Sequence, residues 1–246
     1  MPHFMLIVQY DGTGYAGFQR QPHQPTVQGE IERALEGIFQ EPSRILAAGR
    51  TDAGVHATGQ VIRVSTTRPI PCERLVVALN DCLPRAICIK GGQEVGESFH
   101  PRYDATGKTY SYQIMNRVAR SPFLELYAWH LRPRLDVEAM HSAGQCLVGE
   151  RDFAAFAASG GSACSTVRTV TDVSCRRIED SLVQIRITGN GFLYMMVRNV
   201  VGTLVDVGLG RRKPEDVASV LASRDRSSAG ATAPAHGLCL CEVIYG

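Results

Sequence analysis

Several features that would assign the chain to a particular class of protein are missing. Eight cysteines and seven histidines are present, but none forms a C-x-x-C pair or an H-E-x-x-H motif. The spacings typical of zinc sites are therefore absent, and we expect no metal. No apolar run approaches the roughly 20 residues that span a bilayer, and the apolar residues 4–8 lack the basic flank of a signal peptide. We expect a cytoplasmic protein that does not enter a membrane.

Lysine is also scarce. Only Lys90, Lys108 and Lys213 are lysines among the 26 basic residues, and the net charge is only +2. Arginine suits bidentate contacts to phosphate and stacking on bases. An arginine-rich and alanine-rich composition is equally what a G+C-rich genome produces, so composition alone leaves a polyanionic partner open.

The 246 residues are 44% hydrophobic and 20% charged, which is ordinary for a globular protein. The apolar periodicity of the first half predicts two helices, one beginning after an N-cap at Thr26 and one around Leu75 that stops before Pro84. Strands are expected at residues 4–10, 44–48, 60–65 and 86–90.

The second half shows the same order of elements. Helices are expected after an N-cap at Asp136, over residues 192–207, and after Pro214. Strands are expected at residues 108–115, 167–177, 182–188 and 238–245. Each half thus has the β-α-β-β-α-β order of a ferredoxin-like unit. We predict an α+β protein with subdomains at 1–105 and 106–246 and a cleft between their sheets.

Residues 12–17, GTGYAG, match the G-x-G-x-x-G pattern of dinucleotide-binding proteins. That function requires a helix that opens directly on the glycines, so that its N-terminal amides meet the pyrophosphate. Here the next expected helix waits until Val27. That this loop belongs to a nucleotide-dependent enzyme is therefore only an alternative interpretation. It predicts that the protein binds a dinucleotide.

The densest polar cluster is residues 48–57, AGRTDAGVHA. Two glycines flank Arg50 and Asp52, so the backbone can turn sharply and expose both side chains. Asp52 has no neighbouring acid in the segment, which argues against a paired-carboxylate glycosidase. The segment also shows no Ser or Cys nucleophile with a local His base. The structural alternative is a turn held by Asx hydrogen bonds.

Arg198 lies on an apolar helical face with Met195, Val201 and Val205. An arginine in such a place requires a buried anion, unless its side chain extends to water. If Asp52 supplies the anion, the pair keeps Asp52 ionised, as a nucleophile must be.

Tyr110 and Tyr112 lie on one face of an expected strand. Aromatic residues at this spacing pack a core or form a stacking platform for a base. Lys108 and Arg102 are nearby candidates for phosphate contacts, and Arg20 and Arg120 are further candidates because of their loop positions.

Taken together, several segments resemble the tRNA pseudouridine synthase A family, whose members isomerise uridine in the anticodon stem-loop. They follow the family order along nearly the whole chain and comprise residues 10–13, 17–19, 48–57, 99–105, 108–112, 191–202 and 233–238. The family usually has Ala in place of Pro101 and often Trp in place of Phe18. Neither departure falls on a residue to which the resemblance gives a role in the reaction.

The resemblance implies a pseudouridine synthase fold of two ferredoxin-like subdomains with mixed, mainly antiparallel sheets around a central cleft. It makes Asp52 the catalytic nucleophile, with Arg50 holding a flipped uridine, Tyr110 orienting the uracil and Arg198 paired with Asp52. It also implies a homodimer that acts on tRNA at positions 38–40 without a cofactor. The alternative is a non-catalytic RNA-binding protein built on the same fold.

Overall fold

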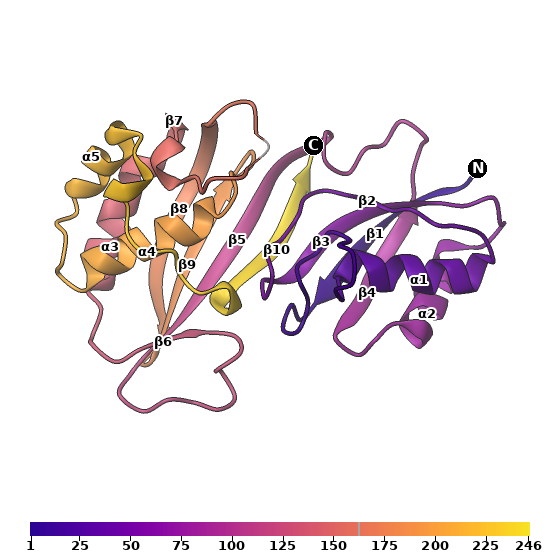
Figure 1. Ribbon diagram of the computed structural model, residues 1–246, viewed down its shortest axis with the longest axis horizontal. Helices are drawn as coiled ribbons and strands as arrows, with labels where there is room; N and C mark the ends of the chain where they lie inside the picture. The colour runs from indigo at the N-terminus through magenta and orange to yellow at the C-terminus, as the bar shows by residue number, and fades with distance from the viewer. Residues whose placement is uncertain (162) are drawn as a thin grey trace. The chain divides into compact units, whose positions relative to one another are not determined.

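The computed structural model describes residues 1–161 and 163–246, which divide into two compact units (Figure 1). Unit 1 comprises Met1–Thr106 together with Cys239–Gly246, and unit 2 comprises Gly107–Leu238. Each unit is built from a sheet with helices packed beside it. Together they form the α+β fold expected from the order of elements.

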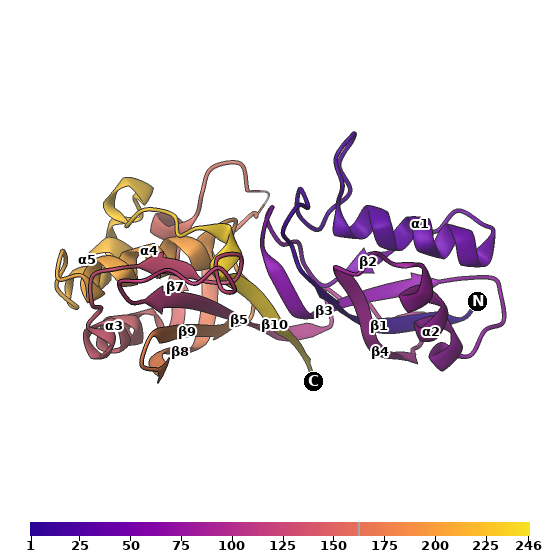
Figure 2. The ribbon, with the colours of Figure 1, turned by 90° about the horizontal axis from the view of Figure 1, so that it is seen from below.

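The sheet of unit 1 contains β1 (His3–Tyr10), β2 (Leu46–Ala47), β3 (His56–Ser65) and β4 (Ile87–Glu94). Strand β1 lies between β4 and β3 and is antiparallel to both, while β2 is antiparallel to β3 on the other side. The order β4-β1-β3-β2 is that of a ferredoxin-like unit. Helices α1 (Val27–Phe39) and α2 (Cys72–Cys82) pack against each other beside this sheet (Figure 2).

The last strand, β10 (Leu238–Tyr245), pairs with β3 in parallel, through Cys239 with His56 and Leu240 with Ala57. Thr106 also donates a hydrogen bond to the carbonyl oxygen of Ile244 at 3.2 Å. These contacts explain why residues 239–246 group with unit 1. The sequence division at residues 105 and 106 places this strand with the second half of the chain instead.

The core of unit 1 follows the two predicted periodicities. Alternate residues of β1 are buried, and so is a helical stripe on α1 formed by Val27, Ile31, Leu35 and Phe39. The hydroxyl of Thr26 accepts a hydrogen bond from the amide of Gly29 at 3.2 Å, which confirms the predicted N-cap.

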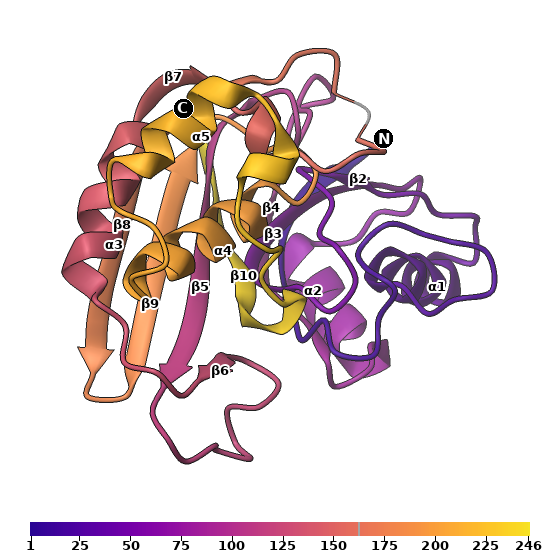
Figure 3. The same ribbon diagram turned by 60° about the vertical axis from the view of Figure 1, so that its left-hand side comes forward.

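Unit 2 contains the remaining strands in the order β5-β9-β8-β7, with β6 parallel to β5. They are β5 (Ala105–Asn116), β6 (Trp129–Leu131), β7 (Gly149–Asp152), β8 (Val167–Glu179) and β9 (Leu182–Gly189). Its helices are α3 (Val137–Gly144), α4 (Met196–Gly208) and α5 (Asp216–Ser223). Helix α3 packs on both β8 and α4 (Figure 3). Among the described residues, none of the helices combines the length and the hydrophobicity that a membrane span requires.

Some boundaries differ from the sequence expectation. Helix α4 begins at Met196 instead of residue 192, because Met195 has a left-handed backbone with φ of 56°. Strand β2 has only two residues, whereas β3 begins four residues earlier than predicted. Strands β6 and β7, of three and four residues, were not predicted, because so short a segment carries no periodicity.

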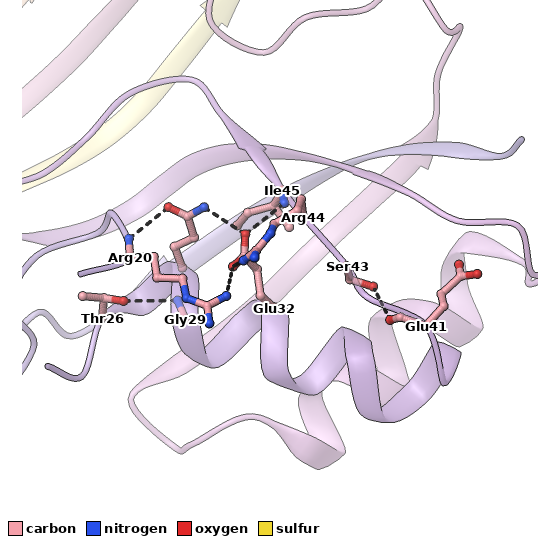
Figure 4. Close-up of polar contacts among 9 residues, drawn as sticks. Arg20, Thr26, Gly29, Glu32, Glu41, Ser43, Arg44 and Ile45 are labelled. Carbon is pink, nitrogen blue, oxygen red and sulfur yellow. Dashed lines mark hydrogen bonds and ion pairs between the residues drawn. The ribbon is translucent and has the colours of Figure 1, made fainter. Parts of the chain in front are cut away.

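A buried carboxylate joins three segments of unit 1. Glu32 on α1 is only 1% exposed, and its oxygens accept hydrogen bonds from Arg20 at 3.2 Å and Arg44 at 3.0 Å (Figure 4). They also accept from the side chain of Gln28 at 2.9 Å and the amide of Ile45 at 3.3 Å. Glu32 therefore fastens the segment after β1 and the segment before β2 to α1.

We expect Glu32→Gln to lower the free energy of unfolding by about 1–3 kcal/mol, since it leaves donors unpaired inside the protein. The two arginines are 54% and 70% exposed, so water compensates much of their loss. Urea unfolding measures the effect. Glu36→Gln, an exposed position of the same helix, is the matched control, and equal midpoints for the two variants would contradict the prediction.

Candidate functional site

The loop between β2 and β3 carries Arg50 and Asp52. Arg50 is exposed and Asp52 is half-buried. The amide of Val55 donates to the carbonyl oxygen of Asp52 at 3.1 Å, and Gly54 has a φ of 75°. This closes the sharp turn that the glycines predict, and it places the two side chains on one short loop.

A second loop, after β1, fastens this turn. The amide of Phe18 donates to the carbonyl oxygen of Thr51 at 3.1 Å, and the hydroxyls of Tyr10 and Thr51 lie 2.7 Å apart. The side-chain amide of Gln60 on β3 donates to the carbonyl oxygen of Gly49 at 3.0 Å. The residue directly before Asp52 is thus held at both its backbone and its side chain.

The glycines of residues 12–17 let the two loops approach closely. A Cβ atom on Gly12 would lie 2.1 Å from the carbonyl oxygen of Val55, and one on Gly17 would lie 2.9 Å from that of Thr51. Gly17 also has a φ of 99°. The next helix begins only at Val27, so these glycines serve packing against the Asp52 loop and do not open a phosphate-binding helix.

The two tyrosines of β5 have different surroundings. Tyr112 is fully buried and its hydroxyl donates to the carbonyl oxygen of Pro234 at 2.8 Å, so it belongs to the core. Burial raises the pKa of Tyr112 far above its ordinary value, which keeps the hydroxyl a neutral donor. Tyr110 is also buried, and its ring meets that of Phe192 edge to face, with centroids 5.2 Å apart.

Arg198 lies in the first turn of α4 and is half-buried. Its Nε atom donates to the carbonyl oxygen of Ala233 at 2.8 Å, and its own carbonyl oxygen accepts from the amide of Ala233 at 3.1 Å. Through these two bonds, the segment before β10 orients the guanidinium group of Arg198.

Asn199 was not assigned a role by sequence reasoning. It is fully buried, and its amide donates to the carbonyl oxygen of Phe156 at 2.7 Å. Its oxygen accepts from Arg226 at 3.0 Å and from the hydroxyl of Thr232 at 2.6 Å. The sequence feature that could have indicated this role is a side-chain amide among apolar residues of a helix. Such an amide must find hydrogen-bond partners when it is buried.

The side chains predicted to contact the phosphate backbone of an RNA come from separate segments. Arg20 is ion-paired with Glu32, and the Arg102 guanidinium lies 5.9 Å from the centroid of the exposed Tyr103 ring. Both belong to unit 1, whereas the half-buried Lys108 belongs to unit 2. Arg120 lies 3.2 Å from Glu125.

The described part of the chain holds no group of three or more His, Cys, Asp or Glu side chains that could bind a metal ion. What the two units offer is a carboxylate and an arginine on a braced loop in unit 1, and an oriented guanidinium and a tyrosine in unit 2. Such groups suit nucleophilic chemistry by a carboxylate and the binding of anions and flat rings.

The structure is thus that of an α+β protein that carries the Asp52 carboxylate on a turn flanked by glycines. The chain matches the family model described as tRNA pseudouridine synthase over residues 6–104 and 143–246. It is 47% identical to tRNA pseudouridine synthase A of Acetivibrio thermocellus and 47% identical to that of Brevibacillus brevis, with complete coverage of each chain. The protein therefore belongs to the tRNA pseudouridine synthase family.

The similar solved structures are more distant in sequence. The archaeal box H/ACA sRNP Nop10–Cbf5 complex matches 82% of this chain and 44% of that chain, with 12% identity and a TM-score of 0.38. The family assignment rests on the sequence matches.

Proposed function

We propose that the protein isomerises uridine to pseudouridine in tRNA, at positions 38–40 of the anticodon stem-loop. The observation that carries this proposal is the full-length identity of 47% to tRNA pseudouridine synthase A. The braced loop that carries Arg50 and Asp52 supports it, because catalysis needs reacting groups held in one geometry.

The reaction breaks the bond between N1 of uracil and C1′ of ribose and forms a bond from C5 to the same C1′. N1 gains a proton and C5 loses one, so the product is an isomer of the substrate. In this proposal Asp52 starts the reaction as the nucleophile, at the uracil ring or at the ribose.

The other residues bind and orient the substrate. Arg198 pairs with Asp52 and keeps it ionised, Arg50 holds the flipped nucleotide, and Tyr110 stacks on or orients the uracil. The base must leave the stack, which costs a few kcal/mol and is least costly in a loop or at a stem end.

The tRNA backbone is bound by arginine and lysine side chains, with Arg20, Arg102 and Lys108 as candidates. We propose further that the enzyme works in the cytoplasm as a homodimer, with one tRNA bound across both subunits.

The experiment is tritium release from tRNA labelled with 5-³H-uridine, since C5 exchanges its hydrogen when it bonds to C1′. We expect release from tRNA with uridine at positions 38–40 and none from the same tRNA with cytidine there. Binding of tRNA without tritium release would contradict the enzyme and support the non-catalytic RNA-binding alternative.

A further inference from the structure

We propose that Tyr10 is a positioning residue for the isomerisation: its hydroxyl, bonded to that of Thr51, sets the direction of the Asp52 carboxylate. The inference rests on the proposed function, in which Asp52 is the reacting group. It concerns only residues of unit 1.

The contact is buried and well defined. Tyr10 is 3% exposed and Thr51 is 7% exposed, and their hydroxyl oxygens lie 2.7 Å apart although 41 positions separate them in the chain. The Tyr10 ring packs on that of Phe18, with centroids 6.0 Å apart. Phe18 in turn donates its amide to the carbonyl oxygen of Thr51. One aromatic pair therefore holds Thr51 at two different atoms.

These bonds act on Asp52 through the backbone. The carbonyl oxygen of Thr51 belongs to the peptide plane before Asp52, and Phe18 holds it at 3.1 Å. The carbonyl oxygen of Asp52 belongs to the plane after it, and Val55 holds it at 3.1 Å. With both flanking planes fixed, φ and ψ of Asp52 are restricted, and so is the direction in which its Cβ atom leaves the backbone.

The side-chain bond adds a third anchor. A hydroxyl pair in the interior gains little net stability over apolar groups of the same shape, because both groups lose water. Val at position 51 would retain the packing and lose this bond, whereas Phe at position 10 would also lose the hydrogen bond between the Tyr10 hydroxyl and the Gln60 side chain. Burial raises the pKa of Tyr10 far above its ordinary value, so the hydroxyl keeps its proton and the bond persists over the whole working range of pH.

The test uses Tyr10→Phe and Thr51→Val, which remove one hydroxyl each, and Thr51→Ser, which retains it. Tritium release from 5-³H-uridine tRNA gives kcat and KM. We expect kcat to fall about 10- to 100-fold in the first two variants, the effect of a small misplacement of a reacting group. KM for tRNA should stay at the parental value, and Thr51→Ser should recover most of the lost kcat.

Tyr245→Phe is the matched control. It removes a half-buried tyrosine hydroxyl bond of unit 1, to the carbonyl oxygen of Pro101 at 2.8 Å, and we expect parental kcat. The double variant Tyr10→Phe with Thr51→Val should lose no more kcat than Tyr10→Phe alone, since Tyr10→Phe already removes the bond between the two hydroxyls. If Tyr10→Phe does not fold by circular dichroism, Thr51→Val provides the same measurement.

Parental kcat in both hydroxyl deletions would overturn the inference, and so would a loss that appears in KM alone. A loss of kcat in Tyr245→Phe as large as in Tyr10→Phe would also overturn it, because the effect would then be general destabilisation. A parent enzyme that releases no tritium would refute the proposed function instead, so the two failures are distinguishable.

Discussion

Asp52→Asn is expected to abolish tritium release from tRNA, with kcat reduced by at least about 10³–10⁴-fold. Asparagine has nearly the same shape as aspartate but carries no negative charge, so it cannot act as the nucleophile. The loop should keep its conformation, because the hydrogen bonds that brace it use the backbone of Asp52 and Thr51 and the Thr51 hydroxyl. Single-turnover assays with excess enzyme measure the chemical step separately from product release.

Asp81→Asn is the matched control, since Asp81 is an exposed aspartate at the end of α2 in the same unit. It should retain parental kcat. The tRNA affinity of Asp52→Asn should stay at the parental level, as measured by filter binding. Substantial turnover in a folded Asp52→Asn variant would show that another group starts the reaction.

Arg198→Met should be the second most damaging substitution, with kcat lowered by about 10²–10³-fold. The proposal gives Arg198 the task of pairing with Asp52, so its removal leaves the carboxylate without its counter-ion. Methionine preserves most of the apolar stem, and the first turn of α4 remains held by the backbone bond between Arg198 and Ala233. Arg198→Lys should recover only part of the activity, because lysine cannot reproduce the planar guanidinium.

The salt dependence of tRNA binding distinguishes this role from a phosphate contact. Arg198→Met should leave affinity and its salt slope at parental values, whereas Arg102→Met should weaken binding and reduce the slope by about one. Arg134→Met, at an exposed position of unit 2, is the control for removing a surface charge. Unchanged turnover in Arg198→Met would count against the ion pair with Asp52.

Local patterns in the sequence predict local structure well. The stripe of Val27, Ile31 and Leu35 with Thr26 before it predicts α1, because spacing and capping involve residues within one or two turns. The glycines around Asp52 predict the sharp turn for the same reason. The left-handed Met195 escapes such reasoning, since nothing in its side chain favours φ of 56° and only the surrounding structure imposes it.

The sequence did not predict the buried roles of Glu32 and Asn199, because their partners lie in distant segments of the chain. Glu32 falls within a helix whose polar residues are expected to face water, and its burial depends on Arg44 and Ile45 arriving from another segment. Asn199 likewise depends on Phe156 and Thr232. No periodicity within one element reveals such partners.

The residues therefore establish on their own the order of helices and strands, the turn at Asp52 and the family to which the motifs point, because these depend on neighbours in the chain. The tertiary structure decides that Cys239–Gly246 joins unit 1 and that Tyr10 reaches Thr51 across 41 positions. Strand partners and buried hydrogen bonds are selected by the packing of whole elements. That packing depends on many distant residues at once, and no single segment encodes it.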